Sequence, residues 1–257
     1  MNRFIWRGQR KDWELKSSFD RYFYYEGLLT SKIREEILEE LFNNFKEKLE
    51  ELKQEDPKKL NKIDFSNLEE RDKNAIWVIG RMYFLPTPTI DWTEDPYISA
   101  YFAFFKKSKE KHFNRVVYAM DIITLKKLML KIILKRHCER VGIKGSKRYV
   151  EIPDINREIL DDDIINRLEK QKSVIIRALN GIDIEKSVIK LVEKKSEYLE
   201  QKRIILAKIF ISNELRNKCL NYLKQEYKEK ITHIKLFSDY HGAVESCKID
   251  IDFENNN

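Results

Sequence analysis

Apolar residues follow helical spacing in some stretches of the chain and strand-like spacing in others. Between residues 31 and 53 they recur every three or four positions among acids and lysines, which predicts an amphipathic helix. A second helix is expected over about 67–84, because Ser66 and Glu69 have the spacing of a capping box. Short apolar and β-branched runs predict strands at residues 3–7, 115–122 and 173–178.

The segment DWTEDPYISAYFAFF, residues 91–105, predicts another helix. Thr93 would cap it, and Pro96 is tolerated in a first turn whose amides have no partner within the helix. Further helices are expected at 124–141, 161–172, 184–201 and from Ser212 onward, and HIKLF (233–237) is expected to form a final strand. Strands and helices mix without a regular βαβ rhythm, so we expect one α+β domain over 1–253, with a helical insert near 31–84 and a disordered tail at 254–257.

The composition is that of a globular protein. Of the 257 residues, 42% are hydrophobic and 12% aromatic, and no apolar run approaches the roughly 20 residues that span a membrane. We therefore expect no membrane partner. The three cysteines are few and odd in number, which fits reduced thiols in the cytoplasm better than a disulfide framework.

Positive charge is concentrated in one stretch. The net charge is +7, and residues 106–148 hold fourteen Lys and Arg against three acids. Lys127, Lys131 and Lys135 share one face of a predicted helix and are candidates for contacts to the phosphates of a nucleic acid. A solvated, solubilising helix face explains the same pattern.

Several kinds of site chemistry lack their sequence signals. None of the four histidines has a partner at metal-ligand spacing, so no metal is expected. The chain has no P-loop, no G-x-G-x-x-G and no G-x-S-x-G. A cysteine nucleophile with a histidine base remains open, although no motif marks one.

Three groups of motifs occur in the order of a known family. They are WRGQ (6–9) with LKSS (15–18), PTPTIDWT (86–93) with AYFA (100–103), and RLEKQKSVI (167–175) with LFSDYHG (236–242). Together they resemble the FRG domain family, which is named for an aromatic-Arg-Gly motif. The chain departs from the family pattern at Arg81–Phe84, where the pattern has Gln-His-aromatic-Gly, at Pro88 in place of Arg, and at Ser173 in place of Gly.

The FRG domain is in turn remotely similar to the ADP-ribosyltransferase fold, a mixed sheet that binds NAD. This similarity implies that Arg7 holds the phosphates or ribose of NAD, that Thr93 contacts the nicotinamide ribose and that Gln171 lies on the third strand of the motif. The glutamate expected two residues after Gln171 is Ser173 here. The implied catalytic residues are Arg7, Thr93 and Gln171, and the implied NAD-binding residues are Arg7, Gly8, Gln9, Thr87, Asp91, Trp92 and Tyr101.

The resemblance implies an intracellular effector, of a toxin or phage-defence type, that uses NAD to modify a protein or nucleic acid. A non-catalytic module of the same fold that binds a nucleotide or nucleic acid is the alternative. Purely structural roles are also open: Trp92 and Tyr101 suit a core, and Asp91 suits a helix cap.

Overall fold

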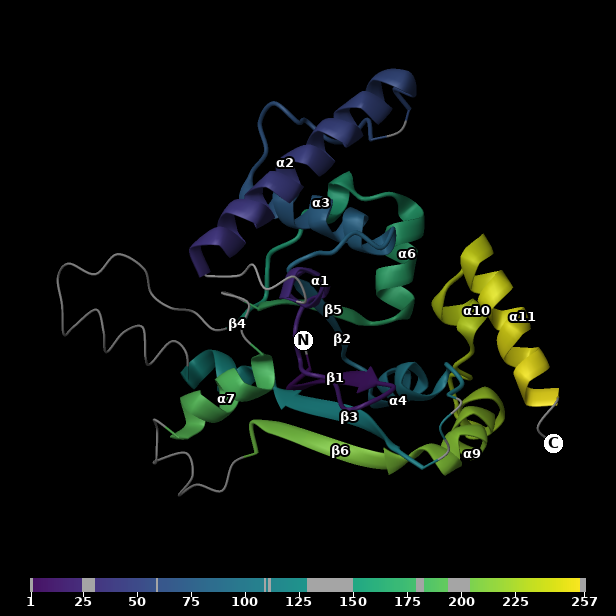
Figure 1. Ribbon diagram of the computed structural model, residues 1–257. Coiled ribbons are helices and arrows are strands. Elements are labelled where there is room, and N and C mark those ends of the chain that lie inside the picture. Colours follow the sequence, from purple (N-terminus) through teal and green to yellow (C-terminus); the bar gives the residue numbers. More distant parts are fainter. Residues whose placement is uncertain are drawn as a thin grey trace.

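The computed structural model describes residues 2–24, 31–58, 60–108, 110, 112–128, 150–178, 183–193 and 204–254. Their centre is a six-stranded sheet in the order β4-β5-β2-β1-β3-β6, in which every pairing is antiparallel (Figure 1). The strands are β1 (Phe4–Gln9), β2 (Thr89–Thr93), β3 (Asn114–Asp121), β4 (Val150–Glu151), β5 (Ser173–Ala178) and β6 (Leu206–Ser212).

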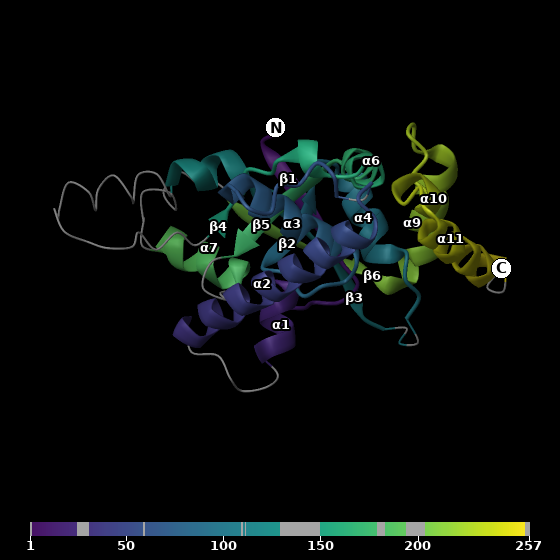
Figure 2. The same cartoon turned by 90° about the horizontal axis from the view of Figure 1, so that it is seen from above.

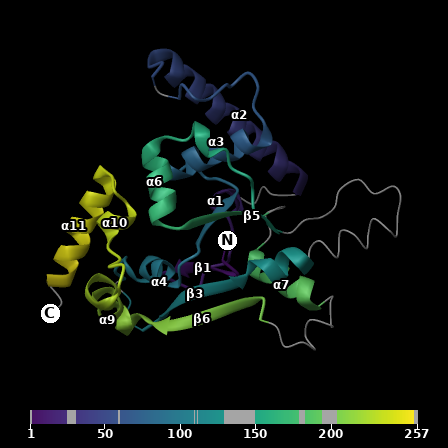
Figure 3. The same ribbon diagram turned by 180° about the vertical axis from the view of Figure 1, so that it is seen from behind.

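Helices surround this sheet, which makes the fold α+β as expected. The α-helices are α1 (Ser18–Tyr24), α2 (Ser31–Glu55), α3 (Glu70–Met82), α4 (Pro96–Phe104), α6 (Asp162–Lys170), α7 (Ile184–Glu193), α9 (Arg216–Asn221), α10 (His233–Leu236) and α11 (Tyr240–Glu254). Short turns of 3-10 helix at Arg157–Ile159 and Asn213–Leu215, and of π-helix at Tyr222–Glu226, connect them. The C-terminal helices α9, α10 and α11 gather at one end of the molecule and α7 lies at the other (Figures 2 and 3).

The sheet is almost divided in two between β1 and β2. β1 pairs with β3 at six residue pairs and β2 pairs with β5 at five, whereas β1 and β2 pair only at Trp6 and Thr93. One half is therefore β4-β5-β2 and the other is β1-β3-β6. Beyond the Trp6–Thr93 pair, the two central strands are not hydrogen-bonded to each other as a ladder.

Three hydrophobic cores hold these halves. One face of the whole sheet packs against α7 in a core that includes Ile5, Trp92 and Val188. On the other face, the β4-β5-β2 half is covered by α2, α3 and α6, where Ile175 is the strand residue in the core. The β1-β3-β6 half is covered by α4, α9 and α10, and Val117 is the buried strand residue in that core.

Helix α4 lies directly on β1 because residue 8 has no side chain. A Cβ atom on Gly8 would lie 1.8 Å from the carbonyl oxygen of Ser99 and 2.6 Å from the amide nitrogen of Ala103. Real Cβ atoms do not approach backbone atoms so closely, so any other residue would push α4 away from the sheet. The glycine of the WRGQ motif is thus explained by packing.

Two buried arginines hold the C-terminal end of α4. The Arg115 guanidinium donates hydrogen bonds to the carbonyl oxygens of Ala103 and Lys106, and Arg216 donates to those of Phe104 and Phe105. These carbonyls lack helical partners, and cations are favoured where a helix ends. Burial lowers the pKa of Arg115 to about 10, so its charge is kept at a cost that these hydrogen bonds offset.

The structure corrects the expected helix over 91–105. Residues 89–93 form β2, and α4 begins only at Pro96. The cap is Asp95, whose carboxylate accepts hydrogen bonds from the amides of Tyr97 and Ile98 at 2.8 and 3.3 Å, so Thr93 as the cap is wrong. The sequence pattern missed the strand because it is only five residues long and runs almost directly into the helix.

Other boundaries differ as well. The capping box of α3 consists of Glu69 and Asp72, one turn later than expected. The expected strand at HIKLF is wrong, because His233–Leu236 form helix α10 and Phe237 is its C-cap. The turn brings the rings of His233 and Phe237 together, with centroids 4.3 Å apart. Helix α11 was not expected. The predicted helices at 124–141 and 184–201 are described only to residues 128 and 193, and the end of the tail, 255–257, lies outside the described residues.

We predict that Gly8→Ala lowers the free energy of unfolding by about 1–3 kcal/mol, the usual cost of overpacking, because the new methyl group meets fixed backbone of α4. Urea unfolding would measure this. Gly80→Ala is the matched control: it lies in a helix that favours Ala, and its nearest neighbour is the flexible tip of Leu85 at 2.7 Å. Equal losses in the two variants would contradict the assigned role of Gly8.

Candidate functional site

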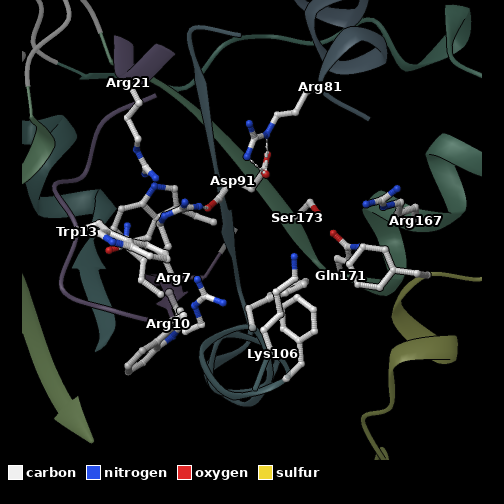
Figure 4. A pocket seen from close by; sticks show the side chains of 17 residues that line it. Arg7, Arg10, Trp13, Arg21, Arg81, Asp91, Lys106, Arg167, Gln171 and Ser173 are labelled. Atoms are coloured by element: carbon white, nitrogen blue, oxygen red, sulfur yellow. Dashed lines mark hydrogen bonds and ion pairs between the residues drawn. The ribbon is translucent and has the colours of Figure 1, made fainter. Parts of the chain in front are cut away.

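A cleft of about 490 Å³ opens where β1 and β2 separate (Figure 4). Both halves of the sheet and the helices above them contribute to its walls. Its lining residues are Trp6, Arg7, Gly8, Gln9, Arg10, Trp13, Arg21, Arg81, Asp91, Trp92, Phe102, Phe105, Lys106, Arg167, Gln171, Ser173 and Phe237. A second pocket of about 380 Å³ adjoins it and shares Arg7, Arg21 and Arg81 with it.

The cleft is strongly basic. Six of its lining residues are cations and only one, Asp91, is an acid; the cations are Arg7, Arg10, Arg21, Arg81, Lys106 and Arg167. They come from β1 and the residue after it, from α1, α3 and α6, and from the residues after α4. A concave surface lined by one sign of charge concentrates ligands of the opposite sign. The expected ligand is therefore an anion.

Arg7 bridges the two halves of the sheet. Its guanidinium donates a hydrogen bond to the backbone carbonyl oxygen of Asp91, across the gap where β1 and β2 are not paired. Burial lowers the pKa of Arg7 to about 10; the negative charge of Asp91 opposes this effect, and the positive charges of Arg81 and Arg21 reinforce it. An anion bound in the cleft would favour the charged form of Arg7.

The Asp91 carboxylate is held by Arg81 of α3. The Arg81 Nε lies 2.6 Å from each carboxylate oxygen of Asp91. Burial opposes ionisation of Asp91, but the charge and hydrogen bonds of Arg81, together with the charges of Arg7 and Arg167, outweigh it and hold the pKa of Asp91 below its usual range. Asp91, the only carboxylate among the described residues that line the cleft, is therefore ionised, and its side chain is 45% exposed.

Aromatic rings line the cleft beside its cations. The Arg167 guanidinium lies over the Phe237 ring at 4.4 Å from the centroid, and that of Arg10 lies 5.6 Å from the Trp13 centroid. Burial lowers the pKa of Arg167, while the charges of Asp239 and Asp91 act in the opposite direction. Such an arrangement offers both flat apolar faces and positive charge to a ligand.

Several buried polar groups of the cleft lack a partner. Gln9 is 3% exposed, and neither atom of its amide has a hydrogen-bond partner within the described part of the chain. The same holds for the Nε atoms of Arg7 and Arg167 and for the indole Nε1 of Trp92. A buried polar group without a partner costs about 1–3 kcal/mol. A polar ligand that reaches these groups would recover part of that cost.

The structure brings six of the sequence-predicted site residues to this cleft: Arg7, Gly8, Gln9, Asp91, Trp92 and Gln171. Thr87, Thr93 and Tyr101 are not among the lining residues. Thr87 is buried with its hydroxyl 2.9 Å from that of Thr89. The Tyr101 hydroxyl lies 3.0 Å from Nδ1 of His233, and both rings pack against Phe105 of the cleft lining. The Thr93 hydroxyl donates to the carbonyl oxygen of Gln171 at 2.7 Å, which ties β2 to the turn before β5.

Gln171 does not lie on a strand, as the similarity to ADP-ribosyltransferases implied. It is the C-cap of α6, and β5 begins only at Ser173. The side-chain amide of Gln171 donates a hydrogen bond to the Leu236 carbonyl oxygen at 3.1 Å. The chain reverses its direction between α6 and β5 at Lys172, which has a φ of 46°. Ser173 lines the cleft at the place where the similarity implied a glutamate, and the lining residues of the described chain include no glutamate.

Sequence reasoning missed most of the cations. Arg10, Arg21, Arg81 and Lys106 come from separate elements, and no common spacing or motif connects them. Arg81 stood out only as a departure from the FRG pattern. The predicted row of basic residues is described only at Lys127, which is exposed. Lys131 and Lys135 lie outside the described residues.

Within the described part of the chain, no group of three His, Cys, Asp or Glu side chains has the arrangement of a metal site. Within the same residues, no helix combines the length and apolar character needed to cross a membrane.

Residues 2–112 match the FRG domain family. The matched segment runs from β1 past α4 and contains Arg7, Arg81, Asp91 and Lys106 of the cleft. It supports the resemblance that the motifs WRGQ and PTPTIDWT indicated. No curated protein and no solved structure matches the chain.

We predict a pH-dependent contribution of the Asp91–Arg81 pair to stability. The pKa of Asp91 is lower in the folded protein than its ordinary value of about 4, so the pair stabilises the fold above that value and ceases to do so as the pH falls through the folded pKa. The difference in urea-unfolding free energy between the wild type and Asp91→Asn should therefore be largest near pH 7 and shrink in acid.

The matched control is Asp250→Asn, which breaks the exposed pair with Lys224 and should change stability little at either pH. A stability difference for Asp91→Asn that stayed constant from neutral to acidic pH would contradict this account of the pair.

Proposed function

We propose that the cleft binds a nucleotide that carries a pyrophosphate, such as NAD or ADP-ribose. The observation that carries this proposal is the combination of six cations, one acid that is paired with Arg81 and several aromatic rings around a single space. Arginine forks bind phosphate oxygens in pairs, and aromatic faces accept nucleobases. The volume of about 490 Å³ also lies in the range usual for small-molecule sites.

The adjoining pocket favours a ligand with two nucleoside ends. Arg7, Arg21 and Arg81 line both the cleft and the second pocket, so they form the boundary between the two spaces. A pyrophosphate held by these arginines would direct one end of a dinucleotide into each space. The remote similarity to NAD-binding ADP-ribosyltransferases that the motifs imply favours the same ligand class, with no metal required.

ADP-ribosyl transfer to a macromolecule is the second candidate, and Asp91 is the observation that favours it. In this reaction the bond between nicotinamide nitrogen and ribose C1′ breaks and its electron pair leaves with nicotinamide. A nucleophile of the acceptor then bonds to C1′ and releases its proton. Positive charge develops on the ribose, and an ionised, half-exposed carboxylate would stabilise it.

Arg81 opposes that stabilisation, because its own charge already offsets the Asp91 carboxylate. For this reason binding without turnover is the first proposal, and transfer by a toxin-like or phage-defence effector is the second.

We predict that isothermal calorimetry detects binding of NAD or ADP-ribose, and that Arg21→Gln weakens it about tenfold or more. The reason is that a charge-assisted hydrogen bond is worth about 1.5–3 kcal/mol. The control is Lys48→Gln, which removes an exposed charge of α2 and should leave affinity unchanged. No heat at millimolar ligand, with the wild type folded, would contradict the proposed function.

We predict for the second candidate that wild-type protein releases nicotinamide from NAD, and that Asp91→Asn slows this release while ADP-ribose binding persists. Chromatographic measurement of nicotinamide separates the two activities. If the wild type binds the ligand but releases no nicotinamide, the transferase proposal is rejected and the proposal of a binding module stands.

A further inference from the structure

The turn after α3 exposes two large aromatic side chains. Helix α3 ends at Met82, and the next residues, Tyr83 and Phe84, are 73% and 79% exposed. The amide of Leu85 donates to the carbonyl oxygen of Gly80 at 2.9 Å, and that of Phe84 donates to Arg81 at 3.2 Å. This pair of hydrogen bonds is the Schellman motif that ends many helices.

Phe84 occupies the position in this motif that normally requires glycine. Its φ is 66°, in the left-handed region where a bulky side chain is strained. Glycine would adopt this conformation without strain and would not expose an aromatic ring to water. A strained, exposed phenylalanine is thus unfavourable for the stability of the isolated fold, and strain of this kind is typical of functional positions.

The turn lies beside the basic cleft. Arg81, the last-turn residue of α3, extends into the cleft and binds Asp91, as the close-up shows (Figure 4). Tyr83 is near enough to Arg167, another cation of the cleft, to be among the groups that influence the pKa of its guanidinium. The exposed rings therefore adjoin a wall of positive charge.

We propose that Tyr83 and Phe84 form a stacking platform for a single-stranded nucleic acid whose phosphates contact the neighbouring arginines of the cleft, Arg81 and Arg167. Exposed rings bind flat apolar faces, and neighbouring arginines bind phosphates; a single strand presents both along its length. A duplex would not fit this platform because its base faces are already covered by their neighbours.

This inference names a macromolecular partner for the site and rests on the proposed function only for the role of the cleft arginines. The two rings are not among the lining residues of the cleft. Loss of the platform should therefore leave the binding of NAD or ADP-ribose unchanged, which lets the two proposals fail separately.

The test is fluorescence anisotropy with labelled RNA and DNA single strands of about 12 nucleotides, long enough to cover a typical single-strand site. The wild type should bind at least one of them, more weakly as salt rises. Phe84→Gly should weaken binding about tenfold, which corresponds to about 1.4 kcal/mol, and Tyr83→Ala should act in the same direction.

Phe84→Gly also provides an internal check on folding. Since glycine suits a φ of 66°, its melting temperature should equal or exceed that of the wild type, so weaker binding could not be attributed to unfolding. The matched control is Phe210→Ala, which removes a 52% exposed ring from β6 at the far edge of the sheet and should leave binding unchanged.

Three results would overturn the platform. They are no binding of either single strand by the wild type, wild-type affinity in Phe84→Gly, and equal affinity for a duplex or for polyglutamate, which would show that charge alone attracts the partner. Unchanged ADP-ribose binding in Phe84→Gly, together with weaker strand binding, would support it.

Discussion

The close contact between Gly8 and helix α4 is the constraint on which the rest of the site depends. It places α4 against β1, while α3 and α6 pack on the other half of the sheet. Because β1 and β2 pair only at Trp6 and Thr93, a gap lies between the two layers. Arg115 and Arg216 hold the far end of α4 through hydrogen bonds to its carbonyl oxygens.

The cleft concentrates like charges at an energetic cost. Burial lowers the pKa of Arg7 to about 10, and neighbouring arginines add to this effect. A backbone carbonyl, one carboxylate and two aromatic rings compensate part of the charge. The side-chain amide of Gln9 and the indole Nε1 of Trp92 have no hydrogen-bond partner within the described chain. Such a site suits the anionic, partly aromatic ligand that we propose for it.

The turn at Tyr83 and Phe84 presents exposed aromatic rings next to the cleft. Its backbone amides donate the usual hydrogen bonds to the last carbonyls of α3, yet the residue with positive φ is Phe84. A phenylalanine at this position is disfavoured both by backbone strain and by the exposure of its ring to water. The rings adjoin the cations Arg81 and Arg167, which gives the surface a mixed aromatic and basic character suited to a polyanion.

The sequence by itself determined the α+β class, helices α2, α3 and α6, strands β3 and β5, and the WRGQ and DWT motifs that meet at the cleft. Long periodic runs and local motifs depend on neighbours in the chain, so they can be recognised there. Only the tertiary structure decided the strand β2, the helical turn at His233 and the basic cleft. Arg21, Arg81 and Lys106 share no spacing, because side chains from separate elements are brought together by packing across a divided sheet.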